Sequence, residues 1–201
     1  MKNKKISGLL YTAVMGVAVL SLASCAEKKF RVSGTITQAK DSVLYLENMS
    51  LNGPKAVDSV KLDENGEFEF KQKAPEAPEF YRLRIANQMV NLAVDSTENI
   101  TVKAAYPTMS ANYEVSGSEE CTKIRDLAYM QLELQTHVAA IANSSSLGVQ
   151  AVEDSVAKVL EVYKNKVKLN YIFKEPMKAY AYYALFQTIV LGNATILIFN
   201  P

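Results

Sequence analysis

The sequence lacks most of the residue patterns on which catalysis depends. It holds two cysteines, Cys25 and Cys121, and no Cys-x-x-Cys pair, which excludes dithiol redox chemistry within this chain. It has no Gly-x-Ser-x-Gly elbow and no glycine-rich phosphate loop. His137 is the single histidine, and without a second histidine or cysteine nearby it is expected to be an ordinary helix residue. We therefore expect no catalytic residue, no cofactor and no bound metal.

The chain also lacks an excess of charge of either sign. It has 22 basic and 21 acidic residues, and a near-neutral chain without a basic block gives no electrostatic case for binding nucleic acid. Lys2, Lys4 and Lys5 precede an apolar run from Ile6 to Leu20, which is the order of a secretory signal. Removal of these three lysines with the signal would leave a formal net charge of −2.

The end of the apolar run carries Leu22-Ala23-Ser24-Cys25, which resembles the lipobox of bacterial lipoproteins. In that family the cysteine is lipidated and the signal is cut before it, and two or three acyl chains hold a protein stably on a membrane. The resemblance implies a signal peptide over residues 1–24, a lipid on Cys25 and a tether over residues 25–29. The alternatives are an uncleaved transmembrane anchor, for which the run is short, or a signal with an incidental cysteine.

The residues after Cys25 indicate which bacterial membrane would hold the protein and which way it would face. Aspartate next to the cysteine would resemble an inner-membrane retention signal, and Ala26 stands there instead. Glu27-Lys28-Lys29 is a poor match to the acidic tract of a surface-export signal. We therefore expect the outer membrane, with the protein facing the periplasm.

Residues 30–117 are predicted to form an antiparallel β-sandwich or open barrel of about eight strands. Their apolar and polar residues alternate, which is the period of a strand with one buried face. The expected strands cover residues 30–37, 42–47, 57–62, 67–71, 80–85, 89–94, 100–104 and 113–115. Asn65-Gly66 is typical of a tight hairpin turn, here between the third and fourth of these strands.

Residues 118–201 are predicted to be a helical spacer region of about three α-helices, which makes the fold class α+β. Ser118, followed by Glu119 and Glu120, is a suitable helix start. Apolar residues then recur every three or four positions to Ile141, and again from about Val149 after a serine-rich loop. A third helix is expected to begin at Pro176.

The last part of the chain carries no charge from Ala179 to Pro201. A transmembrane helix is one interpretation of such a run, but Gln187, Asn193 and two threonines interrupt it. We favour a helix that is apolar all round because more protein covers it. Exposed apolar ends are a liability, so we expect a truncated form of a longer protein or docking against a partner.

Several motifs occur in order along the chain: the lipobox, Val32 to Ile36, Leu44 to Glu47, Asp58 to Gly66, and Phe80 to Leu83. In this order they resemble the β-rich domain of unknown function that precedes the thioredoxin-like domain in envelope thiol-disulfide oxidoreductases of the TlpA/AhpC-TSA type. Residues 175–186 resemble the spacer between those two domains. The family's chemistry belongs to the Cys-x-x-Cys of the second domain, which is absent here, so the resemblance implies no catalytic residue in this chain.

Three further groups of side chains are candidate sites. Cys121 lies on the apolar stripe of its helix and is expected to be a buried, inert free thiol, although a helix N-terminus would lower the pKa of an accessible one. The carboxylates of residues 63–69 lack the spacing of a calcium loop and are expected to be a solvated turn. Tyr81, Arg82 and Arg84 would form either a binding face for a sugar or peptide or an ordinary exposed strand face.

Three functions follow from these patterns. The first is a non-catalytic, membrane-anchored envelope module whose apolar C-terminal helices position a thioredoxin-like domain, dock a protein partner or form a homodimer. The alternative is a lipoprotein that binds a peptide or glycan, which a concave aromatic face on the sheet would favour. The third, a redox role for Cys121 alone, requires an exposed thiol with a low pKa.

Overall fold

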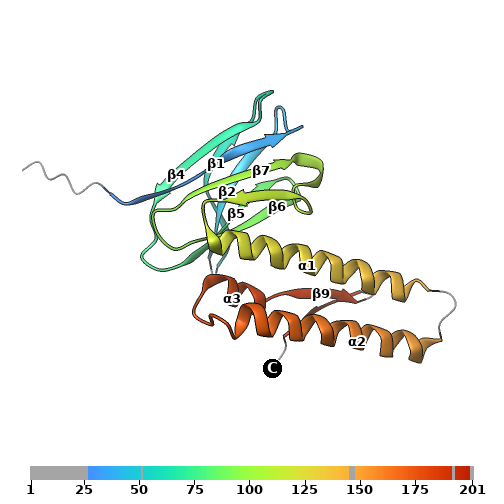
Figure 1. The fold of residues 1–201 in the computed structure, drawn as a ribbon. Coiled ribbons are helices and arrows are strands. Elements are labelled where there is room, and N and C mark those ends of the chain that lie inside the picture. The colour runs from blue at the N-terminus through green and yellow to red at the C-terminus, as the bar shows by residue number, and fades with distance from the viewer. Residues whose placement is uncertain (1–26, 51, 145–147, 192, 200–201) are drawn as a thin grey trace, which may run out of the picture.

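The computed structural model describes residues 27–50, 52–144, 148–191 and 193–199, in which a β-sandwich stands on a layer of helices (Figure 1). One sheet has the strand order β4-β1-β7-β8 and the other β3-β2-β5-β6, and all neighbours are antiparallel except β1 and β7. The strands are β1 (Lys29–Thr37), β2 (Val43–Ser50), β3 (Gly53–Lys61), β4 (Glu67–Lys73), β5 (Glu79–Ile85), β6 (Gln88–Val94), β7 (Asn99–Ala105) and β8 (Tyr113–Ser116). A 3-10 turn, η1 (Tyr106–Thr108), precedes β8.

The helical region follows the sandwich. It contains α1 (Glu119–Ala142), α2 (Val149–Val167) with a π-helical turn η2 (Lys168–Ile172), α3 (Ala179–Leu185), and a two-stranded hairpin of β9 (Thr188–Leu191) and β10 (Ala194–Leu197). In Figure 1, α1 and α2 run side by side in opposite directions, and β9 lies between them. The predicted fold class, α+β with an N-terminal β-rich part followed by three α-helices, is confirmed.

The sandwich core comes from the alternation seen in the sequence. Phe30, Val32 and Ile36 of β1 are buried, and they pack with side chains of the facing sheet such as Leu46 and Leu83. Successive side chains of a strand point to opposite faces, so the apolar half of each strand lies in one shared core.

The Asn65-Gly66 turn is not a hairpin, and that prediction is wrong. β3 and β4 belong to different sheets, so the turn carries the chain from one layer of the sandwich to the other. Gly66 does adopt a positive φ of 67°. The Asp63 carboxylate accepts the N–H groups of Asn65 and Gly66 at 2.9 and 3.0 Å, while the Gly66 carbonyl accepts from the N–H of Ile36 on β1. Turn chemistry fixes the local bend but not the strand that follows it.

The charge-free segment differs most from its prediction. The third helix begins at Ala179 rather than at Pro176, and it ends at Leu185. A β-hairpin follows, because Thr188, Ile189 and Val190 are consecutive β-branched residues that fit strands better than helices. In the described part of the chain, no helix combines the length and the apolar character needed to cross a bilayer.

Gly34 allows β1 and β7 to approach each other in the middle of the first sheet. Its φ is +150°, and a Cβ atom added to it would lie 1.8 Å from the carbonyl oxygen of Val102 on β7. A contact of that length is impossible, so the parallel pair would have to separate if any side chain were introduced.

We predict that Gly34→Ala lowers the free energy of unfolding by at least about 2 kcal/mol, because it combines backbone strain with a displaced core strand. Urea denaturation followed by circular dichroism measures this. Gly148→Ala is the control, since nothing lies within 4 Å of the added Cβ and φ is not positive there. A Gly34 variant as stable as this control would contradict the account.

Candidate functional site

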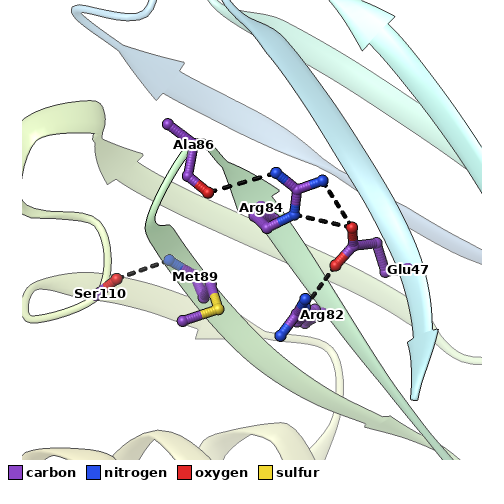
Figure 2. Close-up of polar contacts among 6 residues, drawn as sticks. All are labelled: Glu47, Arg82, Arg84, Ala86, Met89 and Ser110. Atoms are coloured by element: carbon purple, nitrogen blue, oxygen red, sulfur yellow. Dashed lines mark hydrogen bonds and ion pairs between the residues drawn. The ribbon is translucent and has the colours of Figure 1, made fainter. Parts of the chain in front are cut away.

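The outer face of the β3-β2-β5-β6 sheet carries a buried charge cluster. Glu47 on β2 lies opposite Arg82 and next to Arg84 on β5, and its side chain is only 6% exposed. The Nε of Arg82 donates to Glu47 Oε2 at 2.5 Å, and the Nε of Arg84 donates to Oε1 at 2.8 Å (Figure 2). Two guanidinium groups therefore share one carboxylate, which leaves this face with a local positive charge.

The cluster fixes the orientation of both arginines. Arg84 also donates through Nη1 to the carbonyl oxygen of Ala86 at 3.3 Å (Figure 2). Its guanidinium lies 4.7 Å from the centre of the Tyr45 ring. Burial alone would raise the pKa of the Glu47 carboxyl, but the hydrogen bonds and positive charges of Arg82 and Arg84 outweigh it and hold that pKa below its usual value. The carboxylate is therefore ionised at neutral pH.

An apolar hollow lies beside this cluster, where the sheet meets α3. It has a volume of about 190 Å³, and its lining includes Met49, Phe80, Asn91, Tyr183 and Phe186. The Phe80 and Tyr183 rings are 6.5 Å apart, and Asn91 donates through Nδ2 to the Tyr183 hydroxyl at 3.1 Å. Asn91 pairs with Arg82 across the β5–β6 ladder, so the hollow and the charge cluster are neighbours on one face.

The predicted trio of Tyr81, Arg82 and Arg84 is divided between the two faces of the sheet. Arg82 and Arg84 point outward, whereas Tyr81 is buried in the sandwich, with its ring 5.0 Å from that of Phe30. Tyr81 donates to Glu79 at 2.9 Å, and burial together with that carboxylate raises the pKa of its hydroxyl to about 12. Alternation along β5 requires this division, and it was visible in the sequence.

The structure adds residues that sequence reasoning did not select. Glu47 was assigned only to a strand, although the run Leu44-Tyr-Leu-Glu already places its carboxylate on the same side as Tyr45. Asn91 and Tyr183 are 92 positions apart, and no local pattern indicates that they meet.

Cys121 is a buried free thiol in the first turn of α1. Its Sγ lies 3.2 Å from the carbonyl oxygen of Ala93 and donates to it, and its N–H donates to the Ser118 hydroxyl. Burial raises the pKa of the thiol to about 11, with smaller opposing effects from these hydrogen bonds. A redox role would need the opposite environment.

The remaining predicted residues lie apart from this face. His137 is exposed near the outer half of α1, and no group of three metal-ligating side chains occurs among the described residues. Among the carboxylates of residues 63–69, that of Asp63 accepts the hydrogen bonds of the turn described above. Cys25 lies outside the described residues, so its lipidation stays a prediction.

Residues 30–123 match a family whose description is Domain of unknown function (DUF4369), and this match covers slightly less than half of the 201 residues. It includes the sandwich except Lys29, the first residue of β1, and the first turn of α1. The match is consistent with the expected β-rich domain of unknown function. No curated protein matches the chain.

We predict that Glu47→Gln lowers the free energy of unfolding by about 1–3 kcal/mol at pH 7, because it leaves two partly buried guanidinium groups without a countercharge. Since the pKa of Glu47 is lowered in the folded protein, this contribution is present above the ordinary value of 4.5 and is lost as pH falls through the folded pKa. The difference between wild type and variant should shrink in acid. Glu69→Gln, which removes an exposed carboxylate beside Arg31 and Lys71, is the control and should leave the unfolding midpoint nearly unchanged.

We also predict that Cys121 does not react with a thiol reagent at pH 8 until the protein unfolds. The measurement is mass-spectrometric alkylation of the full chain with and without urea. Rapid modification of the folded protein would show that the thiol is accessible, and the burial described here would then be wrong.

Proposed function

We propose that this chain is a non-catalytic envelope lipoprotein module. A lipid on Cys25 holds the β-sandwich at the periplasmic face of the bacterial outer membrane. The helical region docks a thioredoxin-like domain or another protein with thiol-disulfide chemistry. The chain would then position a redox reaction that its partner performs.

The distribution of exposed apolar side chains carries this proposal. In the described part of the sandwich, no large apolar side chain is more than 39% exposed. In the helical region, six are more than 60% exposed: Val149, Val162, Leu169, Phe173, Met177 and Phe186. Apolar surface of this kind marks protein–protein contact sites, and the sandwich does not share it.

Four of these six residues lie in or beside η2 and α3, whereas Val149 and Val162 lie on α2. Leu169 lies in η2 and Phe173 follows it, Met177 shortly precedes α3, and Phe186 follows α3. A second hollow of about 250 Å³ lies there, and its lining includes Phe173, Leu185 and Phe199 together with Lys164 and Lys168. Aromatic side chains are enriched at protein–protein contact sites.

The resemblance supports the class of partner. The motifs of the sandwich and spacer resemble the part of envelope oxidoreductases that accompanies a thioredoxin-like domain. Cys121 is buried with a raised pKa, so redox chemistry would have to come from the partner.

The hollow between the sheet and α3 favours a second candidate function, the binding of a peptide or glycan. Its aromatic lining offers a stacking surface, and the neighbouring Arg82 uses only Nε toward Glu47 in the described contacts. A ligand with an apolar group and a negative charge, such as the end of a peptide, would match this arrangement.

We predict that a photo-crosslinking residue placed at Phe173 or Met177 of the full chain in cells captures a protein with a Cys-x-x-Cys thioredoxin-like domain. The control position is Val57 on β3, which is 38% exposed. Mass spectrometry identifies the adducts. The lipid anchor is tested separately, because Cys25→Ser should move the chain from the membrane to the soluble fraction.

Equal adducts at all three positions, or none, would contradict docking on the helical region. A crosslinker at Met49 tests the second candidate, because that side chain lines the hollow at the sheet. Adducts of small peptides at Met49 alone would favour ligand binding over docking.

A further inference from the structure

The β9–β10 hairpin ends the described chain with an open strand edge. A two-stranded sheet is marginal by itself, and three or more strands or a covering helix are needed for stability. All four residues of β10 are exposed, and the described segment from Ala179 onward carries no charge. Natural edge strands usually carry a charge or a proline that blocks further pairing, and β10 has neither.

The register of the hairpin shows which main-chain groups face outward. β9 and β10 pair antiparallel as Thr188↔Leu197, Ile189↔Ile196, Val190↔Thr195 and Leu191↔Ala194. One step further, the N–H of Ile198 donates to the carbonyl oxygen of Gln187 at 2.9 Å. Hydrogen-bonded and non-hydrogen-bonded pairs alternate in antiparallel ladders, so Ile196 and Ala194 point their main-chain groups toward β9. Thr195 and Leu197 therefore point theirs away from it.

The two edges of the hairpin differ in their surroundings. On β9, the outward carbonyl of Thr188 accepts a hydrogen bond from Gln131 of α1 at 2.6 Å, and Figure 1 shows β9 between α1 and α2. On β10, no hydrogen bond within the described residues reaches the outward N–H and C=O groups of Thr195 and Leu197. Of the two edges, only that of β9 is reached by a hydrogen bond within the described residues, so the β10 edge is the more open one.

We propose that β10 pairs antiparallel with β10 of a second copy of this chain, joining two hairpins into one four-stranded sheet. The two outward residues, Thr195 and Leu197, are symmetric about Ile196. A two-fold axis at Ile196 places Thr195 of each copy opposite Leu197 of the other. Each such pair exchanges two hydrogen bonds, so four hydrogen bonds satisfy every outward group of both strands.

The side chains suit a second copy as well. Ile196 is 41% exposed and meets its own symmetry mate in the non-hydrogen-bonded pair at the axis, where side chains approach most closely. Leu197, which is 43% exposed, lies on the opposite face of β10, next to the exposed Thr195, and extends the apolar contact. No charge on either strand opposes the pairing of identical edges.

An interface of two short strands is small, and small interfaces are weak in solution. Copies held on one membrane meet at a higher effective concentration, which favours such a contact. The inference does not depend on the proposed docking partner, because it uses the β10 edge rather than the surface around Phe173.

The experiment uses the full chain in the bacterial envelope, where disulfides form. Ile196→Cys places two thiols across the axis with Cα atoms about 4.5 Å apart, which lies within the range of disulfide geometry. We expect several-fold more disulfide-linked dimer on a non-reducing gel than Val190→Cys gives. Val190 is the matched control because it is exposed on the same hairpin but lies on β9. Equal dimer from both variants, or none from Ile196→Cys, overturns the proposal.

Charge variants provide a second test that needs no new thiol. Ile196→Lys or Ile196→Glu alone puts like charges opposite each other at the axis and should abolish co-precipitation of two differently tagged copies. Co-expression of the Lys and Glu variants should restore it. Each variant is compared with Val190→Lys, which should co-precipitate as wild type does. Failure of wild-type copies to co-precipitate, or of the opposite charges to restore pairing, contradicts the β10 dimer.

Discussion

The first turn of α1 is the contact on which the arrangement of the two halves depends. Ser118 caps this turn, and its hydroxyl also donates to Glu98 from the β6–β7 connection at 2.8 Å. Three residues later the Cys121 thiol donates to Ala93 of β6. Between them, Glu120 accepts the N–H of Tyr180 at 2.9 Å, which anchors the start of α3. One helical turn therefore joins the sheet, α1 and α3.

This junction gives a structural role to the two buried side chains Cys121 and Glu120, which could otherwise be taken for reactive groups. Glu120 is 8% exposed, and it serves as an acceptor at the N-terminus of α3, where a negative charge is favourable. The DUF4369 match ends at Lys123, just past the same turn. The matched region therefore includes the turn that joins the sheet to α1 and α3.

The sequence predicted the positions of the strands and helices better than it predicted which elements pack against one another. Alternation along the strands and the stripe from Cys121 to Ile141 predicted eight strands and two long helices, because burial of one face leaves a periodic trace. It failed at Asn65-Gly66, where the turn is local but the choice of sheet is not. It also failed after Leu185, where an uncharged run fits a covered helix and a hairpin equally well. The Glu47 cluster required the register of β2 against β5, which no local pattern supplies.

The sandwich and the helical region form one unit through the first turn of α1. Native-state hydrogen exchange of the full chain, resolved by mass spectrometry, tests it directly. The account predicts that amides from Cys121 to Leu127 exchange with the same free energy of opening as those of β6. The contrary result is that this turn exchanges with a lower free energy of opening, equal to that of the first half of α2, while β6 stays protected. The helical region would then open independently of the sandwich, and the two would not form one unit.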